Sequence, residues 1–312
     1  MGAKKWNVND IPDLTDRIVV ITGGNSGLGF ETAKAIAKKG ANLVLACRSE
    51  SRGEAARIKI LEETPEAKVV IIPIDLMDLS SIKSFAENFK QNYTQLHILI
   101  NNAGIMTTPY GLTKDGFESQ MGTNHLGHFA LTGLLLDILT CTPNSRVVVV
   151  SSLAHMGWKI SFKNTLFESA NSYHPMRAYA RSKLANLLFA YELQRKFEIN
   201  GVNSIAVAAH PGASFTNLGR HREGKFMFQL FRPLIKKVLP TPKSGALSQL
   251  RAAVDKNIKS GEFYGPSGFL QLGGSPVLVK PRKTSSNPND AQKLWSISEE
   301  LTGVKYEFKK DW

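Results

Sequence analysis

The sequence predicts an α/β fold: a single doubly wound parallel sheet of the Rossmann type, with helices on both faces. Three observations support this prediction. A short apolar run, Ile18–Ile21, is followed at once by a glycine-rich turn and then by a helical pattern. Further apolar runs alternate with helical stretches as far as about residue 255. These runs are continuously apolar, which is typical of strands buried on both faces of a parallel sheet.

The turn after the first predicted strand has the composition of a phosphate-binding loop, although its spacing differs from the usual G-x-G-x-x-G. Backbone N–H groups at a helix N-terminus can receive a pyrophosphate, and a Cβ would block the close approach. An ordinary strand-to-helix turn is the alternative, but the strand before it and the amphipathic helix after it favour dinucleotide binding. The predicted cofactor-binding residues of this turn are Thr22, Gly23, Asn25, Ser26, Gly27, Leu28 and Gly29.

The remaining elements follow from hydrophobic periodicity. Strands are predicted at Ile18–Thr22, Asn42–Ala46, Val69–Ile74, Leu96–Asn101, Arg146–Ser151 and Asn203–Ala209. Helices are predicted near 28–39, 51–63, 79–91, 116–140, 177–199, 243–254 and 290–302. Right-handed crossovers then give the strand order 3-2-1-4-5-6, with a seventh strand expected beyond it. We expect residues 1–312 to form one domain that ends in a C-terminal extension near 266–312.

Composition narrows the class of protein further. The first 20 residues lack the apolar stretch of a signal peptide, and no run reaches the roughly 18 apolar residues of a membrane span. Two cysteines, Cys47 and Cys141, give no disulfide framework, and Cys47 is expected to be a buried thiol. We therefore expect a cytoplasmic protein, and we predict no metal site.

The net charge of +13 is unevenly distributed. Residues 1–150 carry 15 Lys and Arg against 15 Asp and Glu, whereas residues 151–312 carry 24 against 11. Such a surplus favours anionic partners, namely acidic substrates, anionic lipid or nucleic acid. Solubility alone is the alternative explanation.

Tyr179 and Lys183 are four residues apart on a predicted helix and therefore share one face. A free tyrosine titrates near pH 10, which makes it a poor base at neutrality. An ammonium group close by in a partly buried site would lower the pKa of the phenol toward the working pH of a general acid or base. Chance spacing on a helix surface is the alternative.

Other polar residues follow the predicted strands at the carboxyl edge, where ligands bind in such sheets. Ser152 follows the fifth strand and could bind a substrate oxygen, with Ser151 as a rival for that role. Asn124 lies inside a predicted helix, where asparagine is unfavourable, so it either has a compensating role or faces water. The ends of the third and fourth strands supply Asp75, Leu76, Asn101, Asn102, Ala103 and Gly104.

Arg48 ends the second predicted strand, with Arg52 close by. Enzymes selective for NAD usually carry an acidic residue there, which binds the ribose hydroxyls, whereas an arginine accommodates a 2′-phosphate. The only nearby acid, Glu50, lies past the strand end. The sequence therefore predicts NADP(H) rather than NAD.

Together these residues resemble the short-chain dehydrogenase/reductase family over residues 17–255. The resemblance rests on Thr22–Gly29, Asn101–Gly104, Asn124, Ser152, Tyr179-Ala-Arg-Ser-Lys183 and His210-Pro211-Gly212 with Thr216. It implies a catalytic set of Asn124, Ser152, Tyr179 and Lys183. In the family, Tyr exchanges the proton, Lys binds the nicotinamide ribose and lowers the Tyr pKa, Ser holds the substrate oxygen and Asn holds a relay water. It also implies cofactor contacts from Asp75, Leu76, Asn102, Ala103, Gly104, Tyr179, Lys183, Pro211, Gly212 and Thr216.

Ser152 and Tyr179 are 27 residues apart, farther than in many family members. This long insert, with Ala46-Cys-Arg-Ser49, resembles the branch of retinol dehydrogenases, WW-domain oxidoreductases and protochlorophyllide reductases. We expect an NADP(H)-dependent oxidoreductase that interconverts a carbonyl and an alcohol on a hydrophobic small molecule. A non-catalytic dinucleotide sensor or scaffold is the alternative, although all four members of the set are present. No nucleic-acid motif supports a nucleic-acid partner.

Residues 213–243 form a long connection in which basic and apolar residues alternate. Its segment 219–243 holds seven basic residues and one acid. One interpretation is a substrate lid with an apolar underside and a basic outer face that contacts acidic substrates or an anionic membrane. The other is a short core helix with solvated lysines. The sequence predicts no oligomeric state.

Overall fold

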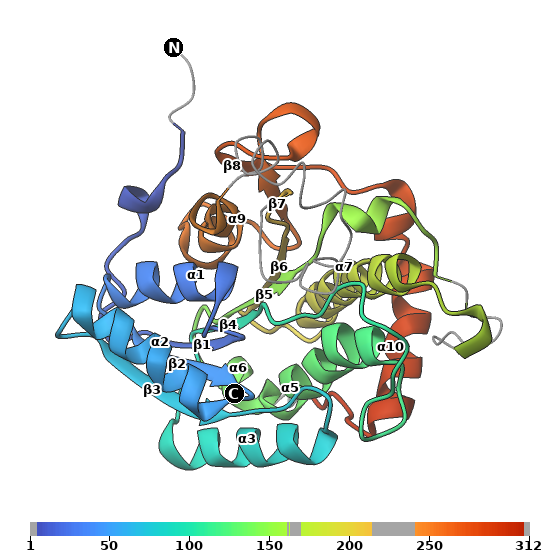
Figure 1. Cartoon of the computed structure of the whole chain (residues 1–312), viewed down its shortest axis with the longest axis horizontal. Helices are drawn as coiled ribbons and strands as arrows, with labels where there is room; N and C mark the ends of the chain where they lie inside the picture. The colour runs from blue at the N-terminus through green and yellow to red at the C-terminus, as the bar shows by residue number, and fades with distance from the viewer. Residues whose placement is uncertain (1–4, 161, 163–169, 214–240, 309–312) are drawn as a thin grey trace.

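The computed structural model describes residues 5–160, 162, 170–213 and 241–308, and within them one sheet has the order β3-β2-β1-β4-β5-β6-β7-β8 (Figure 1). All neighbouring pairs are parallel except β7 and β8. The strands are β1 (Ile18–Thr22), β2 (Asn42–Cys47), β3 (Lys68–Pro73), β4 (Ile98–Asn101), β5 (Arg146–Val150), β6 (Ile205–Ala209), β7 (Phe263–Pro266) and β8 (Pro276–Leu278). The predicted fold class and strand order are confirmed. The antiparallel β8 was not predicted, because its three residues are too few to show a strand pattern.

Helices cover both faces of the sheet. One face carries α1 (Gly27–Ala37), α2 (Glu50–Glu63) and α9 (Pro242–Val254). The other carries α3 (Leu79–Asn92), α5 (Gly127–Leu134), α6 (Leu136–Cys141), α7 (Pro175–Ile199) and α10 (Pro288–Thr302), with the short α4 (Ser119–Met121) beside α7. Alternation along the strands explains the two cores: Val20 packs into one, while Val19 and Ile21 pack into the other.

The predicted helix 116–140 is wrong in one respect, because the structure divides it. A π-helical turn at Gly122–Leu126 separates α4 from α5, and Leu135 separates α5 from α6. A π turn inserts one extra residue into the helix and shifts the side chains that follow; such turns are frequent at functional sites. Asn124, the residue that was unfavourable in a regular helix, lies in this turn.

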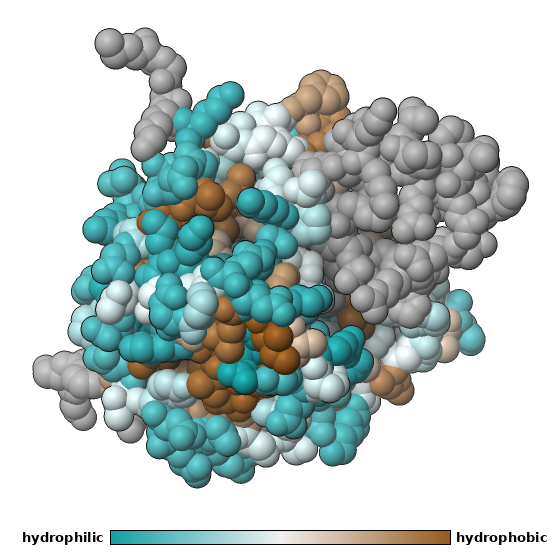
Figure 2. Space-filling model, turned by 60° about the vertical axis from the view of Figure 1, so that its left-hand side comes forward, coloured by the Kyte–Doolittle hydropathy of each residue, from teal (hydrophilic) through white to brown (hydrophobic). Residues whose placement is uncertain are grey.

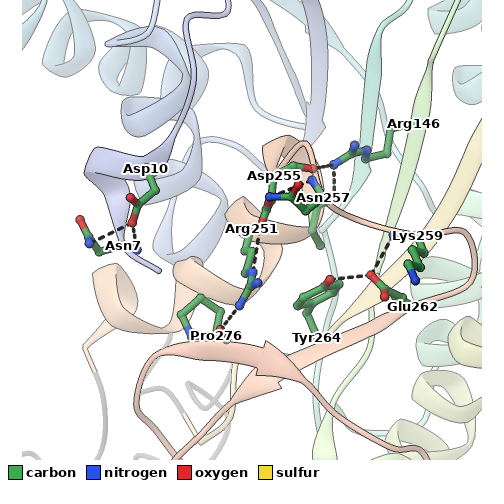
Figure 3. A network of polar contacts seen from close by, with 11 residues as sticks. Asn7, Asp10, Arg146, Arg251, Asp255, Asn257, Lys259, Glu262, Tyr264 and Pro276 are labelled. Carbon is green, nitrogen blue, oxygen red and sulfur yellow. Dashed lines mark hydrogen bonds and ion pairs between the residues drawn. The ribbon is translucent and has the colours of Figure 1, made fainter. Parts of the chain in front are cut away.

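A polar network ties β7 and β8 to α9 (Figure 3). The Arg251 guanidinium donates from Nη1 to the Pro276 carbonyl over 2.7 Å and from Nε to Asp255 over 2.9 Å. Its centre also lies 5.2 Å from the centroid of the Tyr264 ring. These contacts fix the last two strands against the body of the molecule.

The interpretation of 213–243 as a lid concerns residues 214–240, which lie outside the described part of the chain, as does Thr216. Among the helices of the described residues, none combines the length and apolar character that crossing a membrane requires.

Candidate active site

The glycine turn packs its backbone closely enough to form a cradle at the N-terminus of α1. A Cβ on Gly29 would lie 2.4 Å from the Gly23 carbonyl oxygen and 2.5 Å from Nδ2 of Asn102, so only glycine fits there. Ser26, the N-cap residue, makes no side-chain capping bond to the helix. The first N–H groups of α1 therefore lack this common internal partner and are suited to an anion.

Thr22 and Asn102 lock this turn to the end of β4. Thr22 Oγ1 accepts hydrogen bonds from the backbone N–H groups of Asn102 and Ala103, both over 2.9 Å. The Asn102 amide donates in return to the Thr22 carbonyl over 2.7 Å. Asn102, predicted as a cofactor-binding residue, thus holds the cradle in shape through its own side chain. His128, whose Nε2 lies 2.9 Å from Thr22 Oγ1, has no local sequence pattern that would have identified it.

Arg48 and Asp75 lie together beside the cradle, at the ends of β2 and β3. Their side chains form a long ion pair, with 4.0 Å between Arg48 Nη1 and Asp75 Oδ2. The Asp75 carboxylate also accepts the Met77 backbone N–H over 3.0 Å. The Arg48 side chain is 61% exposed, so the guanidinium can approach an anion without leaving a buried environment.

Tyr179 and Lys183 lie on the buried face of α7, one turn apart. The Lys183 ammonium donates to the Val150 carbonyl over 3.1 Å and lies 5.9 Å from the centroid of the Tyr179 ring. Burial lowers the pKa of Lys183 to about 8. Asn186, which the sequence reasoning missed, donates to the same carbonyl over 3.1 Å. Its place three residues after Lys183 on one helix face was the signal available.

The predicted lowering of the Tyr179 pKa is not what this structure gives. Burial raises the pKa of the phenol, and the hydrogen bond with the Ser152 side chain offsets only part of that effect. Desolvation disfavours the charged form of each group, and the Lys183 ammonium donates to a carbonyl rather than to the phenol. The phenol is therefore in its protonated form at neutral pH.

The two adjacent serines at the end of β5 have different positions. The buried Ser151 hydroxyl donates to the Lys183 backbone carbonyl over 2.7 Å, which commits it to the packing of α7. The Ser152 oxygen accepts the Ala154 N–H over 3.2 Å and meets the phenol of Tyr179. The structure thus brings Ser152, and not its rival, to the tyrosine.

Asn124 is fully buried in the π turn and does not face water. Its Oδ1 accepts the Ile105 N–H over 2.8 Å, and its Nδ2 donates to the Ile105 carbonyl and to Ser182 Oγ. A Cβ on Gly104 would lie 3.1 Å from Asn124 Oδ1 and 3.4 Å from Lys183 Nζ. The loop after β4, the π turn and α7 therefore converge at one point.

The loop after β6, residues 210–213, also lies at the carboxyl edge of the sheet. Nδ1 of His210 accepts the Gly212 N–H over 3.2 Å, and the Ala213 N–H donates to the Leu272 carbonyl over 3.0 Å. Pro211 and Gly212 are thereby held against the segment that joins β7 to β8.

A doubly wound sheet with a glycine cradle at its first crossover is typical of dinucleotide-binding proteins. The family model of short chain dehydrogenases matches residues 17–224. Human retinol dehydrogenase 12 is 41% identical, over 94% of this chain and 89% of its own. The WW domain-containing oxidoreductase of Pongo abelii is 40% identical, over 93% of this chain and 69% of its own. A crystal structure of an uncharacterised protein from Mycobacterium paratuberculosis has a TM-score of 0.80 at 40% identity, covering 97% of this chain and 100% of that one.

The chain therefore belongs to the short-chain dehydrogenase/reductase family of oxidoreductases, in the branch of the retinol dehydrogenases and WW domain-containing oxidoreductases.

Proposed function

We propose that this protein is an NADP(H)-dependent oxidoreductase that interconverts a carbonyl and an alcohol, with Tyr179 as general acid and base. The observation that supports it best is the convergence of Ser152, Tyr179 and Lys183 at the carboxyl edge of the sheet. A hydroxyl, a protonated phenol and a buried ammonium meet there next to the dinucleotide cradle. These are the groups that a carbonyl oxygen needs when it becomes an alcohol.

A nicotinamide coenzyme bound in the cradle would supply or accept the hydride. The Ser152 hydroxyl donates a hydrogen bond to the substrate oxygen and so polarises the carbonyl. Tyr179 gives its proton to that oxygen during reduction and takes it back during oxidation. The raised pKa of Tyr179 keeps the phenol protonated, which is the form required for reduction. The Lys183 ammonium stabilises the phenolate that remains after transfer.

The residues of the cradle fit a dinucleotide phosphate. The N-terminus of α1 would receive the pyrophosphate, in a space that a side chain on Gly29 would fill. Arg48 would bind the 2′-phosphate of NADP(H), with Asp75 and Leu76 beside the adenine. The long distance between Arg48 and Asp75 supports this assignment, because the guanidinium gives up little when it turns to a phosphate.

For the substrate we propose a hydrophobic aldehyde, ketone or alcohol. A relative 41% identical over nearly the whole chain is named a retinol dehydrogenase, so long apolar primary alcohols and their aldehydes come first among the candidates. Contact of segment 219–243 with an anionic membrane, and a cytoplasmic location, remain predictions.

A panel of apolar aldehydes, ketones and alcohols tests the proposal, with coenzyme absorbance as the measurement. We expect turnover with NADPH or NADP on at least one apolar member. Ser152→Ala should lower kcat by about a hundredfold, as expected for loss of a positioned hydroxyl. Its matched control, Ser151→Ala, should keep kcat because that hydroxyl is bonded to the Lys183 backbone carbonyl and not to the phenol. Coenzyme binding with no turnover on any member would favour the alternative, a non-catalytic sensor.

A further inference from the structure

The loop between β7 and β8 exposes apolar side chains at the end of the molecule. Phe269 is 84% exposed and Leu270 is 67% exposed, and Leu272 and Leu278 are exposed nearby. The loop projects beyond the strands at the top of Figure 1, and an apolar protrusion stands at the top of the surface in Figure 2. Single exposed apolar residues are ordinary, but a protruding group of them indicates a partner.

The backbone of this loop turns the apolar residues outward and the polar residue inward. Leu270 and Gln271 both adopt positive φ angles, of 50° and 56°, which are unfavourable for residues other than glycine. Bonds from the Gly268 N–H to the Gly273 carbonyl, 2.7 Å, and from the Ser267 N–H to the Ser275 carbonyl, 2.8 Å, hold the turn. The Gln271 amide oxygen lies 2.8 Å from Nε2 of the buried His210. The Gln271 amide is thus directed inward, while the side chains of Phe269 and Leu270 are exposed. The hydrophobic effect favours the opposite arrangement, with apolar groups buried.

The segment that contains the loop carries charge of one sign. Residues 263–289 contain no Asp or Glu, and they contain Lys280, Arg282 and Lys283, all exposed. Leu278 and Lys280, which flank the buried Val279, are both exposed. An apolar tip with a basic flank complements a surface that is negatively charged outside and apolar beneath.

We propose that the β7–β8 loop is a membrane-binding element that inserts Phe269 and Leu270 into a bilayer with anionic headgroups. A tip of this kind penetrates an interface, and nearby basic residues add attraction to anionic lipid. A second copy of the chain fits less well, because a narrow protruding tip offers little of the area that a stable protein interface buries. The loop also contacts the Gly212–Ala213 segment, so insertion would bring the candidate active site close to the bilayer.

Vesicle flotation of the full chain tests the proposal without any enzymatic readout. We expect binding to phosphatidylcholine vesicles that contain phosphatidylserine, and weaker binding without it. The double variant Phe269→Ser/Leu270→Asn should bind about tenfold or more weakly, because two buried apolar side chains are lost. Asparagine accepts a positive φ, so the turn is retained. The control Ile199→Ser removes a side chain that is 70% exposed at the end of α7 and should bind like the wild type.

A second measurement does not depend on the folding of the double variant. The variant Phe269→Trp adds a tryptophan to the tip, and its fluorescence is obtained by subtracting the wild-type emission spectrum. This fluorescence should shift to shorter wavelength when anionic vesicles are added. An unchanged emission, or equal vesicle binding by the wild type and the double variant, would overturn the proposal. So would conversion of a dimer to a monomer in the double variant with vesicle binding unchanged, which would assign the loop to an interface between copies.

Discussion

The carboxyl edge of the sheet contains two regions that are built differently. On the β1–β4 side, the cradle is made of backbone packed at close range, as the 2.4 Å between Gly23 O and a Cβ on Gly29 shows. On the β5–α7 side, the site is made of buried side chains with displaced pKa values, Tyr179 and Lys183. The first region is shaped to hold a ligand, and the second contains groups that exchange protons.

This difference separates binding from chemistry in the proposed enzyme. A substitution in the cradle should change coenzyme affinity and leave the chemical step intact at saturation. Substitution of Tyr179 on the buried face of α7 should change the chemical step and leave coenzyme affinity nearly intact, whereas Lys183, which is also expected to bind the nicotinamide ribose, should affect both. Of the variants that follow, Tyr179→Phe, Arg48→Ala and Gly29→Ala are each expected to fall on one side of this division.

The largest effect is expected from Tyr179→Phe, which removes only the phenolic hydroxyl. We expect kcat to fall by about a thousandfold, within the range that a positioned acid supplies, while the Kd for NADPH stays unchanged. Steady-state kinetics and coenzyme fluorescence titration measure the two quantities. Tyr191→Phe, on the same helix, serves as control and should keep kcat. A Tyr179→Phe enzyme with more than about a tenth of the wild-type kcat would remove Tyr179 from the proposed role.

Lys183 should destabilise the free protein in a manner that depends on pH. Burial lowers its pKa from 10.5 to about 8, so the native state binds fewer protons than the unfolded state between these values. The destabilisation of the native state by the buried Lys183 charge is therefore complete below pH 8, and it disappears as the pH rises toward 10.5. Lys183→Met should raise the free energy of unfolding at pH 7 by up to about 3 kcal/mol, and the gain should vanish near the upper value.

Denaturant unfolding at several pH values measures this difference in the absence of coenzyme. The control is Lys83→Met on α3, where the side chain is 70% exposed and should give no comparable gain. A Lys183→Met protein less stable than the wild type at neutral pH would mean that the bond to the Val150 carbonyl outweighs desolvation.

Arg48→Ala tests coenzyme binding on the cradle side of the site. If the guanidinium binds the 2′-phosphate, its loss should reduce the preference for NADPH over NADH by about 10- to 100-fold, the equivalent of one charge-assisted hydrogen bond. The kcat with saturating coenzyme should change little. Arg57→Ala, on the same side of the sheet but paired with Glu54, is the control. Equal affinities of the wild type for both coenzymes would contradict the NADP(H) assignment.

The sequence predicted what local patterns determine. The glycine turn and the sharing of one helix face by Tyr179 and Lys183 follow from short-range spacing, and the strand order follows from crossover rules. It did not predict what distant contacts determine. The π turn around Asn124 depends on the Ile105 backbone, and the choice between the two serines depends on how α7 packs. The direction of the Tyr179 pKa was wrong because burial, which spacing does not reveal, raises it by more than the hydrogen bond with Ser152 lowers it.

The roles of the predicted site residues remain predictions. Gly29→Ala tests the role of the cradle, because it adds only one methyl group. The added methyl would meet Gly23 O at 2.4 Å, and that residue is itself fixed by a 2.8 Å bond from its N–H to the Ala46 carbonyl. The turn must therefore shift, at an expense of roughly 1–3 kcal/mol shared between stability and coenzyme binding. We expect the Kd for NADPH to rise about tenfold while kcat at saturation is kept. Gly111→Ala, whose Cβ would have only Ser119 Oγ at 3.9 Å, is the control. If Gly29→Ala lowers kcat and leaves the Kd unchanged, the division between a binding region and a chemical region is wrong.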